Sequence, residues 1–441
     1  MGSLSSNPIL GSGKINLNSA LVERPKVLIV AYGCEPGKGS EQGVGWNWAL
    51  QLARFADVTV ITRANNRTSI EADLTSNGAS NPSFVYYDPP PLILFLKRKE
   101  RGLYGFYAAW QWGCYRLARR LHEQDPFTHV MQLTFGSIWL PVFVHRLPVK
   151  FIWGPIGGGE GIPTNLIGFV TGRARLIQLL RNALVSTVSA NPMIVPALKR
   201  ADTILVRTKD TFDILPSYAR SKAHCILETG VGEEALTAFE QALPRPANEA
   251  PVLLYTGRLV GFKNVEMLLH AAALAFANGI RFRIRLVGDG TERHALERLT
   301  KQLGLIDIVD FVGTVPHDKV LRELRDADIY VFPSLREGGP WSLMEAMCAA
   351  LPVICLDTSG MSIITDDMSA IRIKPTSREV IIEGFSDAIS ALCSSPSLRD
   401  RLGRAARERM RDAFLWDRKG EEAARLLFGE ETVSTAIAKA F

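Results

Sequence analysis

Short apolar runs recur along the whole chain, separated by stretches with the periodicity of amphipathic helices. Runs rich in β-branched and aromatic residues predict buried strands, and regular alternation with helices predicts a parallel, doubly wound sheet. The first series of predicted strands is Lys26–Ala31, Val58–Thr62, Phe84–Tyr87, His129–Leu133, Phe151–Trp153 and Thr203–Val206.

The alternation stops in the proline-containing segment 235–250 and then begins again. The second series of predicted strands is Val252–Tyr255, Arg283–Val287, Ile308–Val312, Ile329–Phe332, Val353–Leu356 and Ala370–Ile373. The arginine-rich run from Leu398 to Phe428 has helical spacing. We therefore predict an α/β protein with a disordered leader (1–24), a first Rossmann-like domain (25–235), a linker (236–250), a second Rossmann-like domain (251–413) and a C-terminal helical segment (414–441).

The predicted strand Ile329–Phe332 is followed by a polar loop and by a predicted helix over Trp341–Ala350. The first turn of that helix presents free backbone N–H groups and the positive end of its dipole, which suits a phosphate. Glu337 in the loop and Glu345 in the helix cannot favour an anion, so we expect them to accept hydrogen bonds from hydroxyl groups. Because phosphate and hydroxyl groups occur together in nucleotides and sugar nucleotides, this unit predicts a site for such a ligand.

Two cations are predicted at the same edge of the second sheet. Arg258 follows the strand Val252–Tyr255, and Lys263 comes five residues later, just before a helix. Cations at this place can neutralise a diphosphate as it leaves. A random pair of this kind is more often solvated, but the location shared with the Glu337 loop favours the site. Gly288 ends the next strand, where a simple tight turn explains the glycine almost as well.

Two glycine-rich loops follow strands of the first domain. The loop from Gly33 to Gly45 matches neither the dinucleotide pattern GxGxxG nor the P-loop pattern GxxxxGK[ST], so ATP hydrolysis is disfavoured. The loop Gly157-Gly158-Gly159-Glu160 sets three glycines beside a carboxylate, which is more than a plain turn usually needs. We expect both loops to line a cleft.

Composition narrows the range of partners. Hydrophobic residues make up 47% of the chain and the formal net charge is +6, which is globular composition with a preference for anionic partners. No nucleic-acid-binding motif accompanies the charge. The six cysteines lack the spacing of a zinc site or a disulfide framework, so we expect no metal and a cytoplasmic location. No apolar run is long enough to span a bilayer.

From Val252 to Pro375 the chain resembles the group 1 glycosyltransferases, which are retaining enzymes of the GT-B fold. The residues that carry this likeness are Gly257-Arg258-Leu259 with Lys263, Val287-Gly288-Asp289-Gly290, Phe311-Val312-Gly313, and Glu337 with Glu345. The first domain resembles a bacterial branch of the family through Gly39-Ser40-Glu41, Val44-Gly45-Trp46-Asn47-Trp48, and Trp153-Gly154-Pro155 with Gly157-Gly158-Gly159-Glu160. The resemblance implies GT-B architecture, in which two Rossmann-like domains face a central cleft.

The resemblance also implies roles for single residues. Arg258 and Lys263 would bind the donor diphosphate, Glu345 the ribose hydroxyls and Glu337 the transferred sugar, with Glu337, Arg258 and Lys263 as the catalytic group. The other implied donor-site residues are Gly288, Gly338, Gly339, Trp341 and Ser342. The candidates for the acceptor and phosphate loops are Gly39, Ser40, Glu41, Gly157, Gly158 and Glu160.

The implied reaction moves a hexose-type sugar from a UDP- or GDP-linked donor to a hydroxyl acceptor with retained anomeric configuration. The nucleotide sugar is a co-substrate, no metal or other cofactor is needed, and the leaving diphosphate helps to activate the acceptor. Two positions depart from the family pattern. Pro340 stands where many relatives carry glycine, which removes a backbone donor to the phosphate. Pro155-Ile156 stands where many carry a histidine, and because His129 and His145 are better explained as structural or exposed, Glu160 is the first-domain candidate.

Pro89–Leu121 mixes seven cations with interleaved aromatic residues. Its part 95–120 suits an acidic membrane surface, and an amphipathic helix that packs its aromatics into the first domain is an equal alternative. Arg173–Arg181 adds a second basic, apolar stretch. A lipid-linked or growing polysaccharide acceptor at the inner face of the membrane agrees with both stretches. Competing hypotheses for the whole chain are a sugar-nucleotide epimerase, which shares the fold, and a degenerate transferase that only binds sugar nucleotides.

Overall fold

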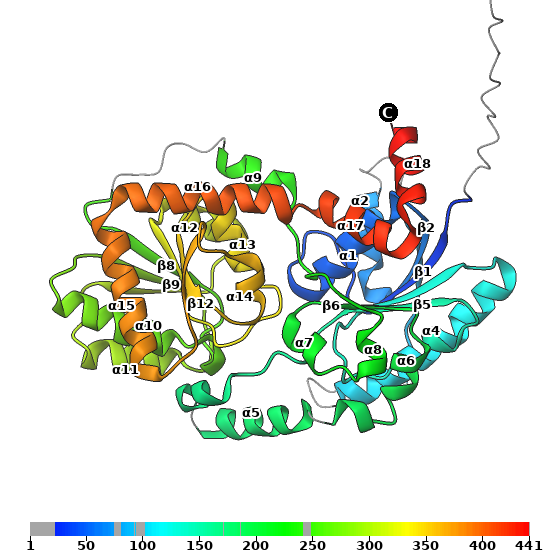
Figure 1. The fold of residues 1–441 in the computed structure, drawn as a ribbon, viewed down its shortest axis with the longest axis horizontal. Coiled ribbons are helices and arrows are strands. Elements are labelled where there is room, and N and C mark those ends of the chain that lie inside the picture. Colours follow the sequence, from blue (N-terminus) through cyan, green and yellow to red (C-terminus); the bar gives the residue numbers. More distant parts are fainter. Residues whose placement is uncertain are drawn as a thin grey trace, which may run out of the picture.

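The computed structural model describes residues 23–74, 81–91, 93, 102–170, 172–185, 187–240 and 248–440. Most of the predicted leader and residues 241–247 of the predicted linker lie outside these ranges. The described chain forms two α/β halves, each built around a parallel sheet (Figure 1).

The first sheet has seven parallel strands in the order β3-β2-β1-β4-β5-β6-β7. Their bounds are β1 Lys26–Ala31, β2 Asp57–Thr62, β3 Ser83–Tyr86, β4 His129–Thr134, β5 Lys150–Ile156, β6 Thr203–Val206 and β7 Ala223–Cys225. The second sheet has six parallel strands in the order β10-β9-β8-β11-β12-β13. Their bounds are β8 Val252–Thr256, β9 Arg283–Val287, β10 Val309–Gly313, β11 Ile329–Phe332, β12 Val353–Leu356 and β13 Ala370–Ile373. In both sheets the strand order reverses beside the first strand, which is the doubly wound arrangement that places ligands beyond the carboxyl ends of the strands.

Helices cover both sheets. In the first half they are α1 Ser40–Ala53, α2 Arg67–Leu74, α4 Leu103–Gln124, α5 Gly172–Val185, α6 Val195–Arg200, α7 Lys209–Asp213 and α8 Ser217–Arg220, with short 3-10 turns η1 Ala64–Asn66, η2 Val144–Arg146, η3 Thr164–Phe169 and η4 Val188–Ala190. In the second half they are α9 Glu233–Glu240, η5 Gly261–Lys263, α10 Val265–Ala277, α11 Arg293–Gln302, α12 His317–Asp326, α13 Trp341–Cys348, α14 Ser359–Ile364, α15 Arg378–Ser394 and α16 Pro396–Ala413. The last two helices, α17 Trp416–Phe428 and α18 Glu430–Ala440, lie against the first half (Figure 1). No helix in these described ranges combines the length and the apolar character that crossing a bilayer requires.

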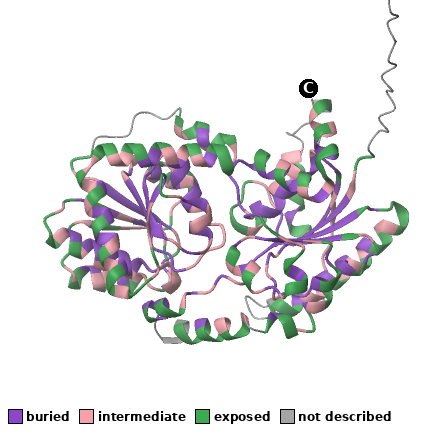
Figure 2. Cartoon of the chain, viewed as in Figure 1, coloured by how far each residue is buried: buried purple, intermediate pink, exposed green. Residues whose placement is uncertain are grey.

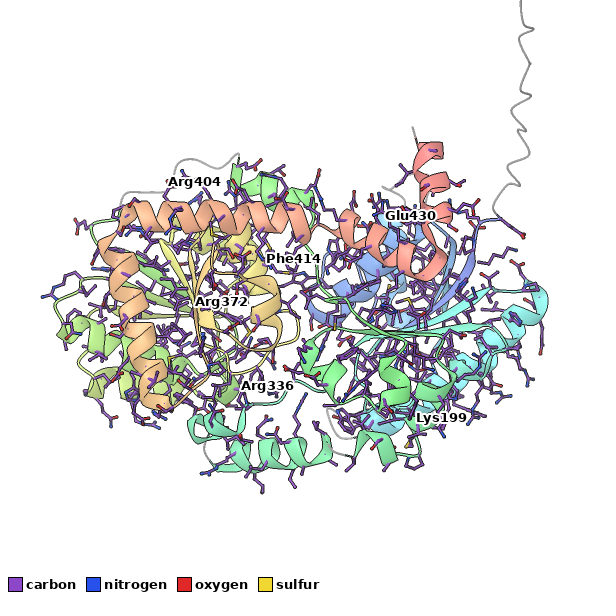
Figure 3. The ribbon with its side chains drawn as sticks, in the orientation of Figure 1. Lys199, Arg336, Arg372, Arg404, Phe414 and Glu430 are labelled. Carbon is purple, nitrogen blue, oxygen red and sulfur yellow. The ribbon has the colours of Figure 1, made fainter. Side chains whose placement is uncertain are left out.

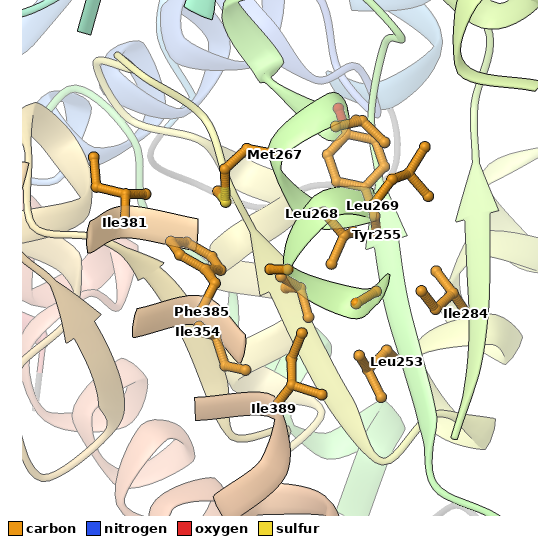
Figure 4. Packing of buried hydrophobic residues seen from close by; sticks show 14 of the residues in the cluster. Leu253, Tyr255, Met267, Leu268, Leu269, Ile284, Ile354, Ile381, Phe385 and Ile389 are labelled. Carbon is orange, nitrogen blue, oxygen red and sulfur yellow. The ribbon is translucent and has the colours of Figure 1, made fainter. Parts of the chain in front are cut away.

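Each half has its own apolar core on its sheet (Figure 2). In the second half, side chains of β8, β9 and β12 pack against α10 and α15, as in the cluster around Leu253, Met267, Ile354 and Phe385 (Figure 4). β8 and β12 are buried on both faces, which explains why their sequences are almost continuously apolar.

The two halves are not separate in their packing. Residues 162–170, here called the crossing segment, belong to the first half but bury Leu166 and Phe169 in the apolar core of the second. Asn165 in the same segment donates hydrogen bonds of 2.7 Å to the carbonyls of Pro375 and Thr376. In the other direction, α17 packs back onto α1, with Trp416 in the apolar cluster of Trp46.

Several predicted elements need correction. The helical run Leu398–Phe428 is two helices, because Leu415 pairs in a β-bridge with Val231 and interrupts the helix between α16 and α17. The first residues of the predicted linker, 236–240, are helical and belong to α9. The strand β7 was not predicted, since its sequence Ala-His-Cys is short and polar. The predicted helix Trp341–Ala350 ends at Cys348.

α4 packs part of its aromatic residues into the first half, as the packing alternative predicted, and membrane contact stays a prediction. Phe106, Tyr107 and Trp110 are fully buried in the core of the first half, whereas Tyr104 and Trp112 are exposed. Residues 95–101 of the predicted membrane-binding stretch lie outside the described residues.

Candidate functional site

The loops after β8 and β11 lie side by side because these two strands pair in the sheet. They bring Lys263 and Glu337 together, with 2.5 Å between the Lys263 Nζ and the Glu337 Oε1. The side chains are only 11% and 16% exposed, and the Ser334 hydroxyl donates to the same carboxylate oxygen at 3.1 Å. The cation predicted for the diphosphate and the carboxylate predicted for the sugar thus form a largely buried ion pair.

Arg258 lies at the same edge, and its side chain is exposed. The backbone of Arg258 is held by a core residue, since the hydroxyl of the buried Tyr255 donates to the Arg258 carbonyl at 2.9 Å. The loop is therefore held by the core while its guanidinium stays available to a ligand.

Glu345 also has a partner that the sequence did not reveal. The His317 Nε2, at the start of α12, lies 2.8 Å from the Glu345 Oε1. This hydrogen bond raises the pKa of His317 above its usual value. Ser342, one turn before Glu345, is hydrogen-bonded to the hydroxyl of Tyr330 in β11. The first turns of α13 are thus tied to the sheet.

The glycines of the donor side have two kinds of surroundings. At Gly288, with φ +130°, an added Cβ would lie 2.0 Å from the Gly257 carbonyl oxygen, so close backbone packing requires this glycine. Gly338 and Gly339 instead face the first half. A Cβ on Gly338 would lie 2.7 Å from the Arg207 Nε, and one on Gly339 would lie 2.3 Å from the Thr229 hydroxyl. The Glu337 loop therefore packs directly on the first half.

Trp341 extends this contact. Its indole N–H donates to the Gly230 carbonyl at 2.6 Å, and its ring meets Trp416 edge-on at 6.5 Å. A Cβ on Gly39 would lie 3.5 Å from this ring and one on Gly43 would lie 2.5 Å from it. The predicted donor residue Trp341 and the predicted acceptor loop at Gly39 therefore touch each other.

In the first half, Glu160 is buried in a dense set of hydrogen bonds. Its carboxylate accepts from Arg207 Nε at 2.9 Å and Nη2 at 3.1 Å, from the hydroxyls of Thr208 and Thr211 at 2.9 Å each, and from the Gly158 N–H at 2.9 Å. Burial alone would raise the pKa of Glu160, but Arg207 and these donors hold it well below its usual range. Glu160 thus orients Arg207 and the glycine loop from inside the protein, and only 1% of it is exposed.

Arg207 and Glu228 were missed by the sequence analysis. Arg207 directly follows β6 and also donates from Nη1 to both oxygens of Glu228, at 2.9 and 3.0 Å. Burial and the nearby Glu41 raise the pKa of Glu228 to about 7, against the opposing charge of Arg207. Glu41, at the start of α1, accepts from the Gly136 N–H at 3.3 Å, and burial raises its pKa. Ser40 begins this helix with φ 59°. The sequence did contain a signal for Arg207, because this residue stands immediately after a predicted strand, at the carboxyl edge of the first sheet.

Comparison with known proteins decides the family of this site. Residues 239–409, which carry Arg258, Lys263, Glu337 and Glu345, match the family model of the glycosyl transferases group 1. This part of the chain is a group 1 glycosyltransferase domain. Together with the first half it forms a GT-B fold, as predicted.

Individual relatives agree with this assignment. The chain is 26% identical over 236 residues to the D-inositol 3-phosphate glycosyltransferase of Kribbella flavida, covering 50% of this chain and 54% of that relative. The match thus spans about half of the relative's length. Sucrose-phosphate synthase from Thermosynechococcus elongatus has a similar fold, with a TM-score of 0.63 at 17% identity, covering 95% of this chain and 100% of the synthase. WaaG, a glycosyltransferase involved in lipopolysaccharide biosynthesis, superimposes with a TM-score of 0.57 at 16% identity, covering 91% and 100%.

Proposed function

We propose that this protein transfers a hexose-type sugar from a UDP- or GDP-linked donor to a hydroxyl group of a glycan acceptor, with retention of configuration and without a metal. The observation that carries the proposal is the buried Lys263–Glu337 pair, set beside the exposed Arg258 in a loop that packs on the first half. A cation and a carboxylate at one strand edge suit the two ends of a sugar diphosphate, whose phosphates need positive charge and whose sugar needs acceptors for its hydroxyl groups.

The chemistry follows from charge. In this proposal Arg258 and Lys263 stabilise the negative charge that grows on the diphosphate when the bond to the sugar breaks. Lys263 moves part of its contact from Glu337 to the phosphate, which releases the Glu337 carboxylate to accept hydrogen bonds from the sugar. The departing diphosphate oxygen takes the proton of the acceptor hydroxyl on the same face of the sugar.

The ribose of the donor is assigned to Glu345. Its carboxylate is 24% exposed and bonds to His317, so one side of it is engaged and the other is open to hydroxyl groups. Pro340 caps α13 without a backbone N–H, which leaves the diphosphate more dependent on Arg258 and Lys263.

For a lipid-linked acceptor we infer that α5, rather than α4, faces the membrane. Its residues Leu176, Ile177, Leu180 and Leu184 are 56–59% exposed, which is unusual for one helix of a globular domain. Arg175 is exposed on the same helix and would complement acidic lipid headgroups. In Figure 1, α5 lies at the bottom of the view, on the outside of the molecule.

A donor panel tests the transferase proposal. UDP-, GDP-, ADP- and dTDP-sugars are scored by their rise in melting temperature and by hydrolysis, and lysates serve as the acceptor source. We expect one donor to stabilise the protein and to be consumed, and Glu337→Gln to retain donor binding while losing turnover. Release of an epimerised sugar nucleotide would favour the epimerase, unchanged cellular function in Glu337→Ala would favour a binding protein, and a panel without any stabilising donor would refute the proposal.

Membrane attachment is tested separately by flotation with vesicles of phosphatidylglycerol or of phosphatidylcholine. We expect binding to the acidic vesicles and its loss in Leu176→Glu. Leu274→Glu, at a position 38% exposed on the second half, is the matched control and should still float. Equal flotation of both variants would place the membrane contact elsewhere.

A further inference from the structure

Two arginine side chains near the cleft carry N–H groups without an acceptor. Arg181 belongs to α5, and Arg336 to the loop between β11 and α13. Within the described part of the chain, the Nε atom of each is buried and makes no hydrogen bond. Figure 3 places Arg336 between the second half and α5. A buried guanidinium N–H that lacks an acceptor costs free energy, so two such groups in one region indicate that a ligand supplies the acceptor.

The two arginines share one electrostatic environment. Glu160 and Arg207 act on the pKa of both, and Arg181 acts on that of Arg336. Burial, followed by the repulsion from Arg181, lowers the pKa of Arg336 to about 10, and burial lowers the pKa of Arg181. The Arg336 guanidinium lies 4.8 Å above the ring of Phe262, which holds it in place. The charges of Arg181 and Arg336 thus repel each other in a partly buried region.

The carboxylates that act on this pair already have partners. Glu160 accepts five hydrogen bonds and forms its ion pair with Arg207. Glu337 forms its ion pair with Lys263 and accepts from Ser334. The positive charge of the arginine pair is therefore not balanced by these neighbours, and an anion from outside would balance it.

We propose that Arg181 and Arg336 bind an anionic group of the acceptor, either a phosphate or a carboxylate. The inference rests on the proposed transferase function for the identity of the acceptor. Arg181 comes from the first half, where the acceptor is expected, and Arg336 stands next to Glu337, where the transferred sugar is expected. An oxyanion between them would receive charge-assisted hydrogen bonds from both halves and would be distinct from the donor diphosphate at Arg258 and Lys263.

The first test uses inorganic phosphate as the probe and the full chain as the protein. Phosphate affinity is measured by calorimetry for the wild type, for the double variant Arg181→Gln, Arg336→Gln, and for Arg298→Gln, an exposed arginine of α11 in the second half. We expect about tenfold weaker binding or more in the double variant and wild-type binding in the control. Wild-type affinity in the double variant would overturn the proposal, because phosphate would then bind only at other cations.

Thermal melting separates ligand binding from a structural role. Since the charge of neither arginine is balanced by a carboxylate in the free protein, the double variant should melt at or above the wild-type temperature. A clear drop would show that these side chains serve the fold and would contradict the assignment.

The second test distinguishes the source of the anion. With the donor found in the panel, kcat/KM is compared for a sugar phosphate, a uronic acid and a neutral sugar as acceptor. We expect the double variant to lose about tenfold to hundredfold with one of the anionic acceptors and to match the wild type with the neutral one. If the loss in kcat/KM depended instead on whether the donor sugar is anionic, the acceptor assignment would be overturned. Absence of transfer with every donor would refute the transferase function, while the phosphate affinities would still decide whether the anion site exists.

Discussion

Replacing Glu160 by glutamine separates a structural from a catalytic role for this residue. The change keeps the shape of the side chain and removes the charge that Arg207 binds. It also turns an oxygen that accepts hydrogen bonds into an N–H donor that faces other donors, among them Thr208 and Gly158.

The expected loss in the free energy of unfolding follows from the interactions that the substitution removes. Removing one partner of a buried ion pair costs about 3–5 kcal/mol. Arg207 keeps its two hydrogen bonds to Glu228, so we expect the lower end, about 3 kcal/mol. For a domain of this size each kcal/mol lowers the melting temperature by about 2–4 °C, which gives a drop of roughly 6–12 °C.

The pH dependence has a defined sign. The native pKa of Glu160 lies below its usual value of 4.5, so the stabilisation by this carboxylate is complete above about pH 4.5 and is lost as the pH falls toward the native pKa. The wild type should therefore lose melting temperature below about pH 4.5 more steeply than Glu160→Gln does.

The assay is differential scanning calorimetry combined with donor turnover. Glu297→Gln, which breaks a partly exposed helix ion pair with Arg293, is the matched control and should melt close to the wild-type temperature. If Glu160→Gln melted at the wild-type temperature and yet lost turnover, Glu160 would be a catalytic residue and the anchoring argument would be refuted.

Three further substitutions test the cleft. Arg258→Ala should weaken donor binding about tenfold or more in calorimetry without changing the melting temperature, because this side chain is exposed. Glu345 raises the pKa of His317, so their ion pair is complete below pH 6.5 and is lost as the pH rises through the native pKa of His317. Loss of the ion pair frees the Glu345 carboxylate for the ribose hydroxyls. Donor binding should therefore tighten from about pH 6 to about pH 8 in the wild type and stay level in His317→Gln. Gly43→Ala would put a Cβ 2.1 Å from the Lys38 carbonyl oxygen and 2.5 Å from the Trp341 ring, so it should displace the loop before α1, loosen the Trp341 contact between the halves and increase the radius measured by small-angle scattering.

The controls for these substitutions are also in the chain. Gly105→Ala, with no atom within 4 Å of the new Cβ, should leave the scattering radius unchanged. Donor affinity that is unaffected in Arg258→Ala would remove this residue from the diphosphate site. A pH profile that persists in His317→Gln would show that another group titrates.

Most of the strands could be predicted because they are buried on both faces. Lys26–Ala31 was predicted with the bounds that β1 has, since an uninterrupted apolar run has few other solutions in a soluble fold. β7 could not be predicted from Ala-His-Cys, because a short edge strand depends on its neighbour β6 rather than on its own side chains. The break at Leu415 has the same kind of cause, since its β-bridge partner Val231 is far away in sequence.

The proximity of candidate site residues could be predicted where these residues follow neighbouring strands. Lys263 and Glu337 lie in loops that follow neighbouring strands, and the structure brings them to 2.5 Å. The pairing of Glu160 with Arg207 was not predictable, because it depends on how two loops 47 residues apart fold over the sheet edge. His317 was missed for a similar reason, since the start of α12 meets α13 only through the packing of both helices on the second sheet.

The crossing segment 162–170 has a consequence for how this chain can be divided. Leu166 and Phe169 fill part of the core of the second half, so a fragment that begins at residue 251 would expose the apolar groove they occupy and should aggregate. A chimera that exchanges donor halves between relatives would have to carry the matching crossing segment with it. If the two halves of the proposed transferase open to exchange the donor, they cannot separate without withdrawing this segment, so we expect hinge motions that keep Leu166 and Phe169 buried.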